Sequence, residues 1–432
     1  MMSQTVLSFK LEKTNDEISS QAGLALFGEF IDGLGLSGLL DRHLPGPGSA
    51  VGYQPSQFVV PLVLMLHGGG RSLEDLRQIR LDAGLRELLG LDKLPSSDAT
   101  GDWLRRMGAG DGLAGLGRSN RDFSRRVLRS EKHTDYTLDI DASQVVAEKQ
   151  EAKWTYKGER GYMPIVGHLA QNGLVIGEEF REGNDSPGAR NLPFITYCAR
   201  QMPKGKRIAH LRADSATYQA SVFNWCEGKK ISFAIAADMD TAVKATISAI
   251  PESDWRPYQD GFIAESVHSM NKTKKSFRLI VVKRPMQREL FEDEQRDQKK
   301  LSERYHVIAS NRVGQSAEET LRWYHLRGDT SENRLKELKI GFGMERMPCG
   351  QFEANAVFFR IGVLAYNLFV FFKMAALPDE WRRCQVQTIR WRFYQVAGKV
   401  THHAGRVSLK VREWMFALYE EVRAKCWEAS LA

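Results

Sequence analysis

The sequence predicts an α/β protein in which a mixed β-sheet is flanked by helices, with largely helical regions at both ends of the chain. Strand-like alternation of apolar and polar residues begins at residue 135 and recurs in short segments up to residue 310. Helical segments separate the later strands. With 432 residues, 42% hydrophobic and 26% charged, the chain has the composition of a globular protein of two or three domains.

The order of the central elements predicts the type of sheet. Three strands come first, and Asn172-Gly173 between the second and third is a strong hairpin signal. A helix, a strand, a helix and a further strand follow. The strands are expected at 136–143, 161–170, 174–180, 207–213 and 231–237, and the helices at 192–200 and 218–227. This order describes a mixed sheet with flanking helices, as in ribonuclease-H-like domains.

The regions around this core divide the chain into five parts. Residues 1–130 read as a helical DNA-binding domain, residues 131–237 as the first part of the core, and residues 238–312 as a β-rich insertion. Closing helices of the core are expected in 313–375, and a helical, basic C-terminal region in 376–432. Residues 354–372 are apolar, but Asn355, Arg360 and Asn367 are costly in lipid, so a buried helix is expected and no membrane.

The helical front contains a candidate DNA-reading helix. Short helices with tight breaks, and a last helix that carries Arg105 and Arg106, suit a helix-turn-helix-like module. An ordinary helical bundle explains the same pattern. We expect Arg105 and Arg106 to contact DNA in the first case.

The charge of the chain favours a polyanionic partner. The formal charge is +8 and the pI is about 9.1. Residues 381–412 contain eight Lys and Arg residues and no Asp or Glu, with aromatic residues between them. From this segment we expect Arg390, Arg392 and Lys399 to bind DNA; a solvated basic face is the alternative.

The cysteines and the N-terminal residues bear on the cellular compartment of the protein. The five cysteines form no C-x-x-C pair, so neither a disulfide framework nor a zinc site is indicated, and a reducing compartment suits them. The first residues lack the apolar core of a signal peptide. A cytoplasmic location is therefore expected.

Three carboxylates stand where predicted elements end or begin, which suits divalent metal ions in phosphodiester chemistry. Asp141 lies near the end of the first strand, and Asp139 shares its face as a competing candidate. Asp214 follows the fourth strand, where it could instead cap a helix. Glu332 shares a predicted helical face with Lys336 and Lys339, although it could also complete a capping box.

The succession Tyr324, Arg327, Glu332 and Lys339 resembles the Tyr-Arg-Glu-Lys signature of DDE insertion-sequence transposases. Two residues separate the Tyr from the Arg and six separate the Glu from the Lys, as in that signature. Four residues stand between Arg327 and Glu332 where the signature has three. The resemblance covers roughly residues 135–370 and includes both aspartates and the insertion.

The resemblance implies a ribonuclease-H-like DNA transposase that moves an insertion sequence by cutting and pasting. Asp141, Asp214 and Glu332 would hold two Mg²⁺ ions, which Mn²⁺ could replace, and Tyr324, Arg327 and Lys339 would clamp phosphates, with Lys336 beside them. The partners would be inverted-repeat element ends and target DNA, bound by a homodimer in the bacterial nucleoid.

Two other functions use the same residues. A nuclease on this core would cut without strand transfer, and a silent descendant would bind DNA only. A separate hypothesis gives Trp255, in the insertion, the task of holding a flipped base, against the alternative of an ordinary core residue.

Overall fold

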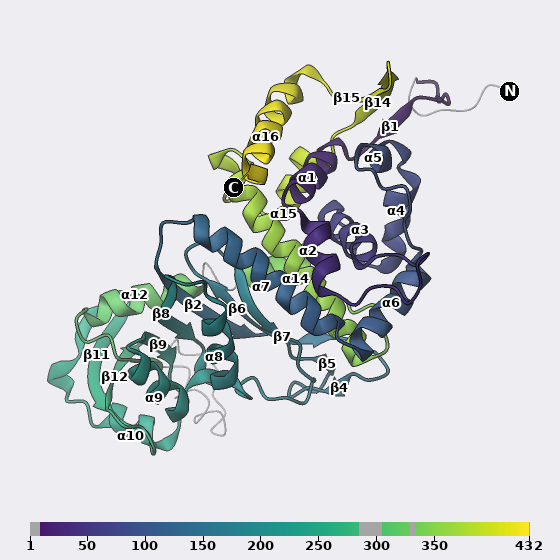
Figure 1. Cartoon of the computed structure of the whole chain (residues 1–432). Coiled ribbons are helices and arrows are strands. Elements are labelled where there is room, and N and C mark those ends of the chain that lie inside the picture. Colours follow the sequence, from purple (N-terminus) through teal and green to yellow (C-terminus); the bar gives the residue numbers. More distant parts are fainter. Residues whose placement is uncertain (1–8, 285–304, 329–332, 432) are drawn as a thin grey trace.

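A mixed β-sheet forms the centre of the protein (Figure 1). The structure is a computed structural model that describes residues 9–284, 305–328 and 333–431. Within these residues the sheet has nine strands in the order β10-β11-β12-β13-β9-β8-β2-β6-β7. The five strands of its core half are β2 (Asp135–Ala142), β6 (Ile165–Leu169), β7 (Val175–Glu179), β8 (Arg207–Ala213) and β9 (Ser232–Ala236).

The pairing of these strands confirms the predicted ribonuclease-H-like fold. β2 pairs antiparallel with β6, and β6 pairs antiparallel with β7. On its other side β2 pairs parallel with β8, and β8 pairs parallel with β9. The Asn172-Gly173 turn joins β6 to β7, and Gly173 has a φ of 89°, which a residue without a Cβ adopts most easily.

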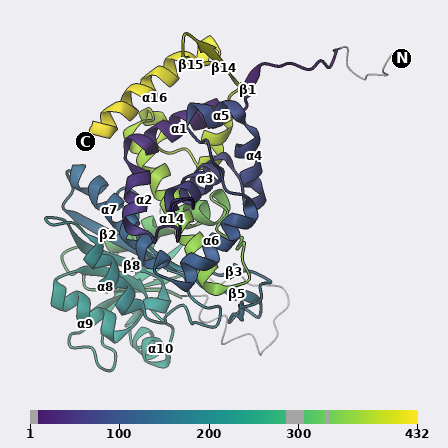
Figure 2. The same ribbon diagram turned by 45° about the vertical axis from the view of Figure 1, so that its right-hand side comes forward.

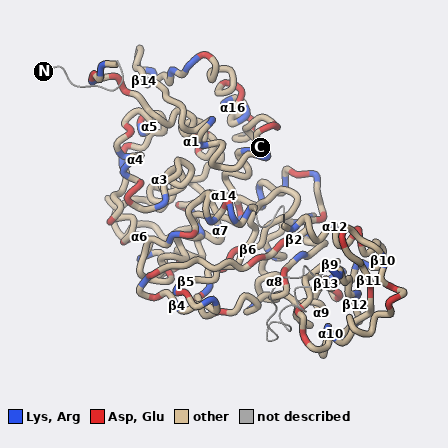
Figure 3. Tube along the Cα trace, turned by 180° about the vertical axis from the view of Figure 1, so that it is seen from behind, with Lys and Arg blue, Asp and Glu red and all other residues tan. Residues whose placement is uncertain are grey.

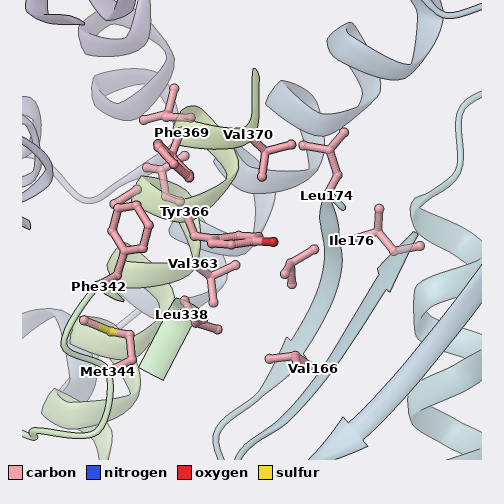
Figure 4. Packing of buried hydrophobic residues seen from close by; sticks show 14 of the residues in the cluster. Val166, Leu174, Ile176, Leu338, Phe342, Met344, Val363, Tyr366, Phe369 and Val370 are labelled. Carbon is pink, nitrogen blue, oxygen red and sulfur yellow. The ribbon is translucent and has the colours of Figure 1, made fainter. Parts of the chain in front are cut away.

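Helices cover both faces of this sheet. They are α8 (Asn191–Gln201), α9 (Ala220–Lys229), α12 (Ala317–Arg327) and α14 (Phe352–Ala375). Tyr366 and Val370 of α14 point toward Leu174 and Ile176, while Phe369 packs against Phe342 in the same cluster (Figure 4). The apolar faces of these strands are therefore covered by the apolar helix α14 and are not exposed to solvent.

The helix α14 is long and apolar enough to cross a membrane by length and composition, but 89% of its apolar window is buried inside the protein. Its polar residues have partners there. The side-chain amide of Asn367 both accepts from the amide of Val175 and donates to its carbonyl, each at 2.8 Å. Asn355 donates to the Tyr162 hydroxyl at 3.1 Å. These contacts are those of a core helix.

The insertion extends the core sheet instead of forming a sheet of its own. It starts with α10 (Thr241–Ser248) and contains β10 (Arg256–Tyr258), β11 (Gly261–His268), β12 (Phe277–Lys283) and β13 (Tyr305–Ser310). These strands form an antiparallel series, and β13 pairs antiparallel with β9. In Figure 1 they make up the lobe farthest from the two termini.

The N-terminal helices gather around α14 (Figure 2). They are α1 (Ala22–Gly33), α2 (Leu36–His43), α3 (Pro55–Gly68), α4 (Leu76–Leu81), α5 (Ala83–Leu88), α6 (Ser97–Ala109) and α7 (Gly112–Ser130). Ser96 caps α6, as its hydroxyl accepts from the Ala99 amide. At Gly108 a Cβ would lie 2.7 Å from the Glu353 backbone, so α6 and α14 are in close contact.

The C-terminal region departs from the expected helical tail. It contains the hairpin of β14 (Gly398–His403) and β15 (Arg406–Lys410) before the helix α16 (Glu413–Leu431). The turn residues Ala404 and Gly405 both have positive φ, which is typical of tight hairpins. β1 (Glu17–Ser19) pairs with β14, and α16 packs against α1, so the two ends of the chain form one unit (Figure 1).

Candidate active site

Asp141 and Asp214 lie at the ends of neighbouring parallel strands. In the pairing of β2 with β8, Asp139 stands opposite Arg212. Asp141 and Asp214 each follow two residues later, so both carboxyl groups come to the same edge of the sheet. Both residues are partly buried. This edge, at the carboxyl ends of the strands, is where open α/β sheets bind their ligands.

Arg327, the last residue of α12, contacts this edge of the sheet. Its guanidinium lies 3.3 Å from Asp141 and donates to the Ile140 carbonyl at 3.2 Å. Burial acts to lower the pKa of Arg327, but the charges of Asp141, Tyr324 and Asp214 raise it above its ordinary value. Arg327 is therefore a fixed cation next to the carboxylates.

The negative charge of the Asp214 carboxylate is only partly compensated by its surroundings. Burial raises its pKa, and the nearby Arg327 and the Ala216 amide offset this only in part. A buried anion whose pKa is raised gains from a further cation beside it. The oxygen ligands of Asp141 and Asp214 are those that hard divalent ions prefer, so this pair fits a divalent metal ion.

Glu332, the third predicted carboxylate, lies outside the described residues. The segments on either side of it are held to the sheet. Arg327 contacts β2 as above, and Arg334 in α13 (Asn333–Lys336) donates to the carbonyls of Leu169 and Ala170 at 2.8 and 2.9 Å.

Asp139 has a different environment from Asp141. It is fully buried, and its two oxygens accept from Nε and Nη2 of Arg212, each at 2.7 Å. Arg212 also donates to the Trp323 carbonyl in α12 at 2.6 Å. The pair thus joins β2, β8 and α12 directly beneath Asp141 and Asp214. The sequence offered one signal for it, because Asp139 and Arg212 each precede a predicted carboxylate by two residues.

Lys339 contacts the two residues that follow β2. Its ammonium donates to the Ser143 hydroxyl at 2.9 Å and to the Gln144 carbonyl at 2.8 Å. Lys336 is exposed instead. The expected shared face assumed a regular α-helix, but residues Glu337–Gly341 form a π-helical turn, which changes the angle between successive side chains.

Tyr324 is 8% exposed and packs in a cluster with Ile308 and Leu321. Burial raises the pKa of its hydroxyl, the charge of Arg327 lowers it, and the charges of Asp214 and Asp141 raise it further. The charges of both aspartates thus act on the Tyr324 hydroxyl. Arg327 contacts Asp141 directly, whereas Lys339 contacts Ser143 and Gln144, which follow Asp141 in the chain.

The predicted DNA-binding arginines of the front domain are on its surface. Arg105 and Arg106 are exposed on α6, whereas Trp103, Leu104 and Met107 point into the core. Arg105 forms an ion pair with Asp102 one turn earlier. Lys and Arg are interspersed with Asp and Glu in both lobes of the molecule (Figure 3).

Arg390 corrects the expectation for the basic C-terminal segment. It is 3% exposed, and its guanidinium donates to the carbonyls of Leu66, His67 and Gly341 at 2.6 to 2.8 Å. Its side chain therefore closes the last turn of α3 and is not part of the protein surface. Arg392 and Lys399 are exposed, as expected, although Lys399 pairs with Asp16 at 3.0 Å.

Trp255 immediately precedes β10, is partly buried and packs against the core cluster. Its ring lies 6.3 Å from that of Tyr305, and the Lys283 ammonium is 5.3 Å from its centroid. These contacts favour the structural interpretation of Trp255 over base holding.

The fold and the site together define a ribonuclease-H-like enzyme with acidic groups at the edge of its sheet. The chain belongs to the family described as transposase DDE domain group 1, whose model matches residues 5–421. It is therefore a DNA transposase, and this family generally uses divalent metal ions.

Two further comparisons add context. A cryo-EM structure of the piggyBac transposase synaptic complex with hairpin DNA is similar to this chain, with 9% identity and a TM-score of 0.47. The match covers 86% of this chain and 79% of that one. Among curated proteins, the sequence comparison finds no significant match.

Proposed function

We propose that this transposase cleaves DNA at the ends of an insertion sequence and joins the freed ends to target DNA. Asp141, Asp214 and Glu332 would hold two Mg²⁺ ions, which Mn²⁺ could replace. The observation that carries the assignment is the meeting of Asp141 and Asp214 at the ends of two neighbouring parallel strands, with Arg327 against Asp141.

The metal ions, when bound, would activate the attacking oxygen and stabilise the leaving oxygen. The protein's own side chains supply the positioning. Arg327 is fixed by the Ile140 carbonyl and can present a planar guanidinium to a phosphate, while Lys339 offers a point charge on the other side of Asp141. Tyr324 is buried in the apolar cluster with Ile308 and Leu321.

Asp141 is preferred to Asp139 as the first metal ligand. Both oxygens of Asp139 are engaged by Arg212, and breaking a buried pair of this kind leaves an uncompensated charge. Asp141 is less buried than Asp139. We assign Asp139 to the support of the site.

DNA would contact the protein over a wider area. Arg105 and Arg106 would approach the bases of the terminal inverted repeats, and Arg392 and Lys399 would bind phosphates without regard to sequence. We further propose that the enzyme acts as a homodimer on DNA in the bacterial nucleoid.

The test is metal-dependent cleavage of a plasmid that carries the element ends. Asp141→Asn, Asp214→Asn and Glu332→Gln should each reduce nicking by at least about 100-fold, because removal of a ligand removes several kcal/mol of transition-state stabilisation. DNA binding should persist. The matched control is Asp135→Asn, at the opposite end of β2, where an exposed aspartate pairs with Arg207. It should cut normally.

Two results would contradict the assignment. Normal cutting by Asp141→Asn, with a folded but inactive Asp139→Asn, would make Asp139 the ligand. If wild-type protein nicks the plasmid but never joins a precut donor end to a second DNA, the enzyme is a nuclease without strand transfer.

A further inference from the structure

A small β-sheet interrupts the core between β2 and β6, directly after Asp141. It consists of β3 (Val145–Val146), β4 (Lys153–Trp154) and β5 (Arg160–Tyr162), in the order β3-β5-β4. We call residues 145–162 the β3–β5 segment. In Figure 1, β4 and β5 lie beyond β7, on the side of the molecule away from the insertion lobe.

The tip of this segment exposes two aromatic side chains to solvent. Trp154 and Tyr156 are each 66% exposed, whereas Thr155 between them is 6% exposed. Lys153 and Lys157 are exposed beside them, and the Lys157 ammonium is 5.7 Å from the centroid of the Tyr156 ring. Adjacent exposed aromatics with cations are the combination that binds unpaired nucleic-acid strands, because rings stack on bases and ammonium groups neutralise phosphates.

Hydrogen bonds hold the exposed tip in place. The Gln144 side chain donates to the Thr155 hydroxyl at 2.9 Å and to Glu159 at 3.0 Å. Arg160 donates to the carbonyls of Lys149 and Ala152 at 2.9 and 3.0 Å. The two rings are therefore presented on a fixed support, so stacking on them costs less ordering of the protein.

The same bonds connect the tip to the active site. The carbonyl of Gln144, whose side chain fixes Thr155, accepts from the Lys339 ammonium. Burial lowers the pKa of Lys339; the charge of Glu345 raises it, that of Lys157 lowers it, and that of Asp141 raises it. Gln144, three residues after Asp141, therefore links Lys339 to the tip that carries the two rings.

We propose that Trp154 and Tyr156 stack on unpaired bases of the DNA strand beside the cleavage site, with Lys153 and Lys157 on its phosphates. The partner is single-stranded or locally opened DNA. This inference rests on the proposed position of cleavage at Asp141 and Asp214. It places a strand-separating contact on the core domain, on a segment that follows the first catalytic strand.

The experiment compares two DNA probes bound to the full chain without divalent metal. One is a blunt duplex, and the other is the same duplex with a short unpaired overhang that carries a fluorescent adenine analogue. Trp154→Ala/Tyr156→Ala should bind the overhang probe roughly 5- to 100-fold more weakly, the range expected when one or two bases no longer stack on a ring, and should no longer quench the analogue. Blunt-duplex binding should change little.

Three control variants separate stacking from other effects. Trp427→Ala removes an equally exposed tryptophan from α16 and should leave both probes unaffected. Trp154→Phe/Tyr156→Phe keeps two rings and should keep most of the preference for the overhang. Lys153→Gln/Lys157→Gln should weaken binding of the overhang probe and reduce the salt dependence of that binding.

Unchanged overhang affinity and quenching in Trp154→Ala/Tyr156→Ala would overturn the proposal. The proposal would also be overturned if Trp154→Ala/Tyr156→Ala changed the oligomeric mass of the DNA-free protein in solution but affected neither probe. The two rings would then contact a second copy of the chain. Nicking by Asp141→Asn reports separately on the catalytic assignment. Its persistence would refute that assignment, while the binding data would still show whether the rings stack on bases.

Discussion

Two buried arginines of this transposase, Arg212 and Arg390, are almost equally hidden but have opposite kinds of partner. Arg212 is 2% exposed and forms a bidentate pair with the Asp139 carboxylate. Arg390 is 3% exposed and donates to backbone carbonyls at the end of α3 and at Gly341. One arginine balances a charge in the catalytic sheet, and the other satisfies the end of a helix.

The difference shows what each arginine does for its surroundings. The Arg212 pair fixes the register of β2 and β8 beneath the two candidate metal ligands, so it belongs to the catalytic half of the molecule. Arg390 donates to carbonyl groups instead of a carboxylate, and burial lowers its pKa to about 10, so it is still a cation at neutral pH. A run of basic residues in a sequence therefore contains side chains with unlike tasks.

The largest expected effect is at Arg212. Arg212→Met should lower the free energy of unfolding by about 3–5 kcal/mol, because it leaves Asp139 buried without its counter-charge. Arg360→Met, which breaks the buried pair with Glu178 on β7, is the matched control and should cost a similar amount. Thermal unfolding checks both.

Arg212→Lys sharpens this comparison. It keeps the charge but removes the bidentate geometry, and we expect it to raise the metal concentration needed for half-maximal nicking. Arg360→Lys should leave that concentration unchanged. Equal metal dependence in the two variants would reduce Arg212 to a purely structural role.

Arg390→Met should have the next largest effect. It leaves buried carbonyls without donors and should cost about 1–3 kcal/mol of stability. DNA affinity per folded molecule should be unchanged, since the side chain does not reach the surface. Arg392→Met, two residues later and exposed, serves as the control for stability. A stable Arg390→Met protein that binds DNA poorly would contradict the helix-closing role of Arg390.

The surface cations should affect binding and not stability. Arg392→Gln with Lys399→Gln should change the free energy of unfolding by less than about 0.5 kcal/mol. The dependence of log affinity on log salt should become shallower by roughly one unit for each phosphate that is no longer neutralised. Binding titrations at several salt concentrations measure this. An unaltered slope would mean that both side chains are merely solvated.

The smallest expected effect concerns Asp214 and pH. Burial raises its pKa in the folded protein. The stability from this group is therefore fully present below the ordinary aspartate pKa and is lost as the pH rises through the raised folded value. At neutral pH without divalent metal, Asp214→Asn should melt slightly above wild type. Added Mg²⁺ or Mn²⁺ should raise the melting temperature of wild type more than that of the variant.

Melting curves across pH provide the check on Asp214. Asp214→Asn could instead melt below wild type at neutral pH, with the same rise in melting temperature on addition of metal. The ionised carboxylate would then stabilise the metal-free protein, which would support a helix-capping role for Asp214.

Much of the catalytic core follows from local patterns in the sequence. The alternation around Leu138 and Ile140 and the Asn172-Gly173 turn predict strands and a hairpin that the structure contains. Asp141 stands near the end of such a strand and Asp214 directly after one, and both positions follow from the same patterns, because a strand's end can be read from where its alternation stops. The third predicted carboxylate, Glu332, rests on the signature alone.

Only the tertiary structure decided which charged side chains meet. Asp139 and Arg212 are 73 positions apart, and Arg390 and His67 are 323 apart. The addition of the insertion to the core sheet, and the pairing of β1 with β14, likewise join distant segments. Periodicity reports which face of an element is apolar, but it does not say which element covers that face. From the sequence alone, a basic residue such as Arg390 is therefore expected to be exposed, and only the tertiary structure shows that it is buried.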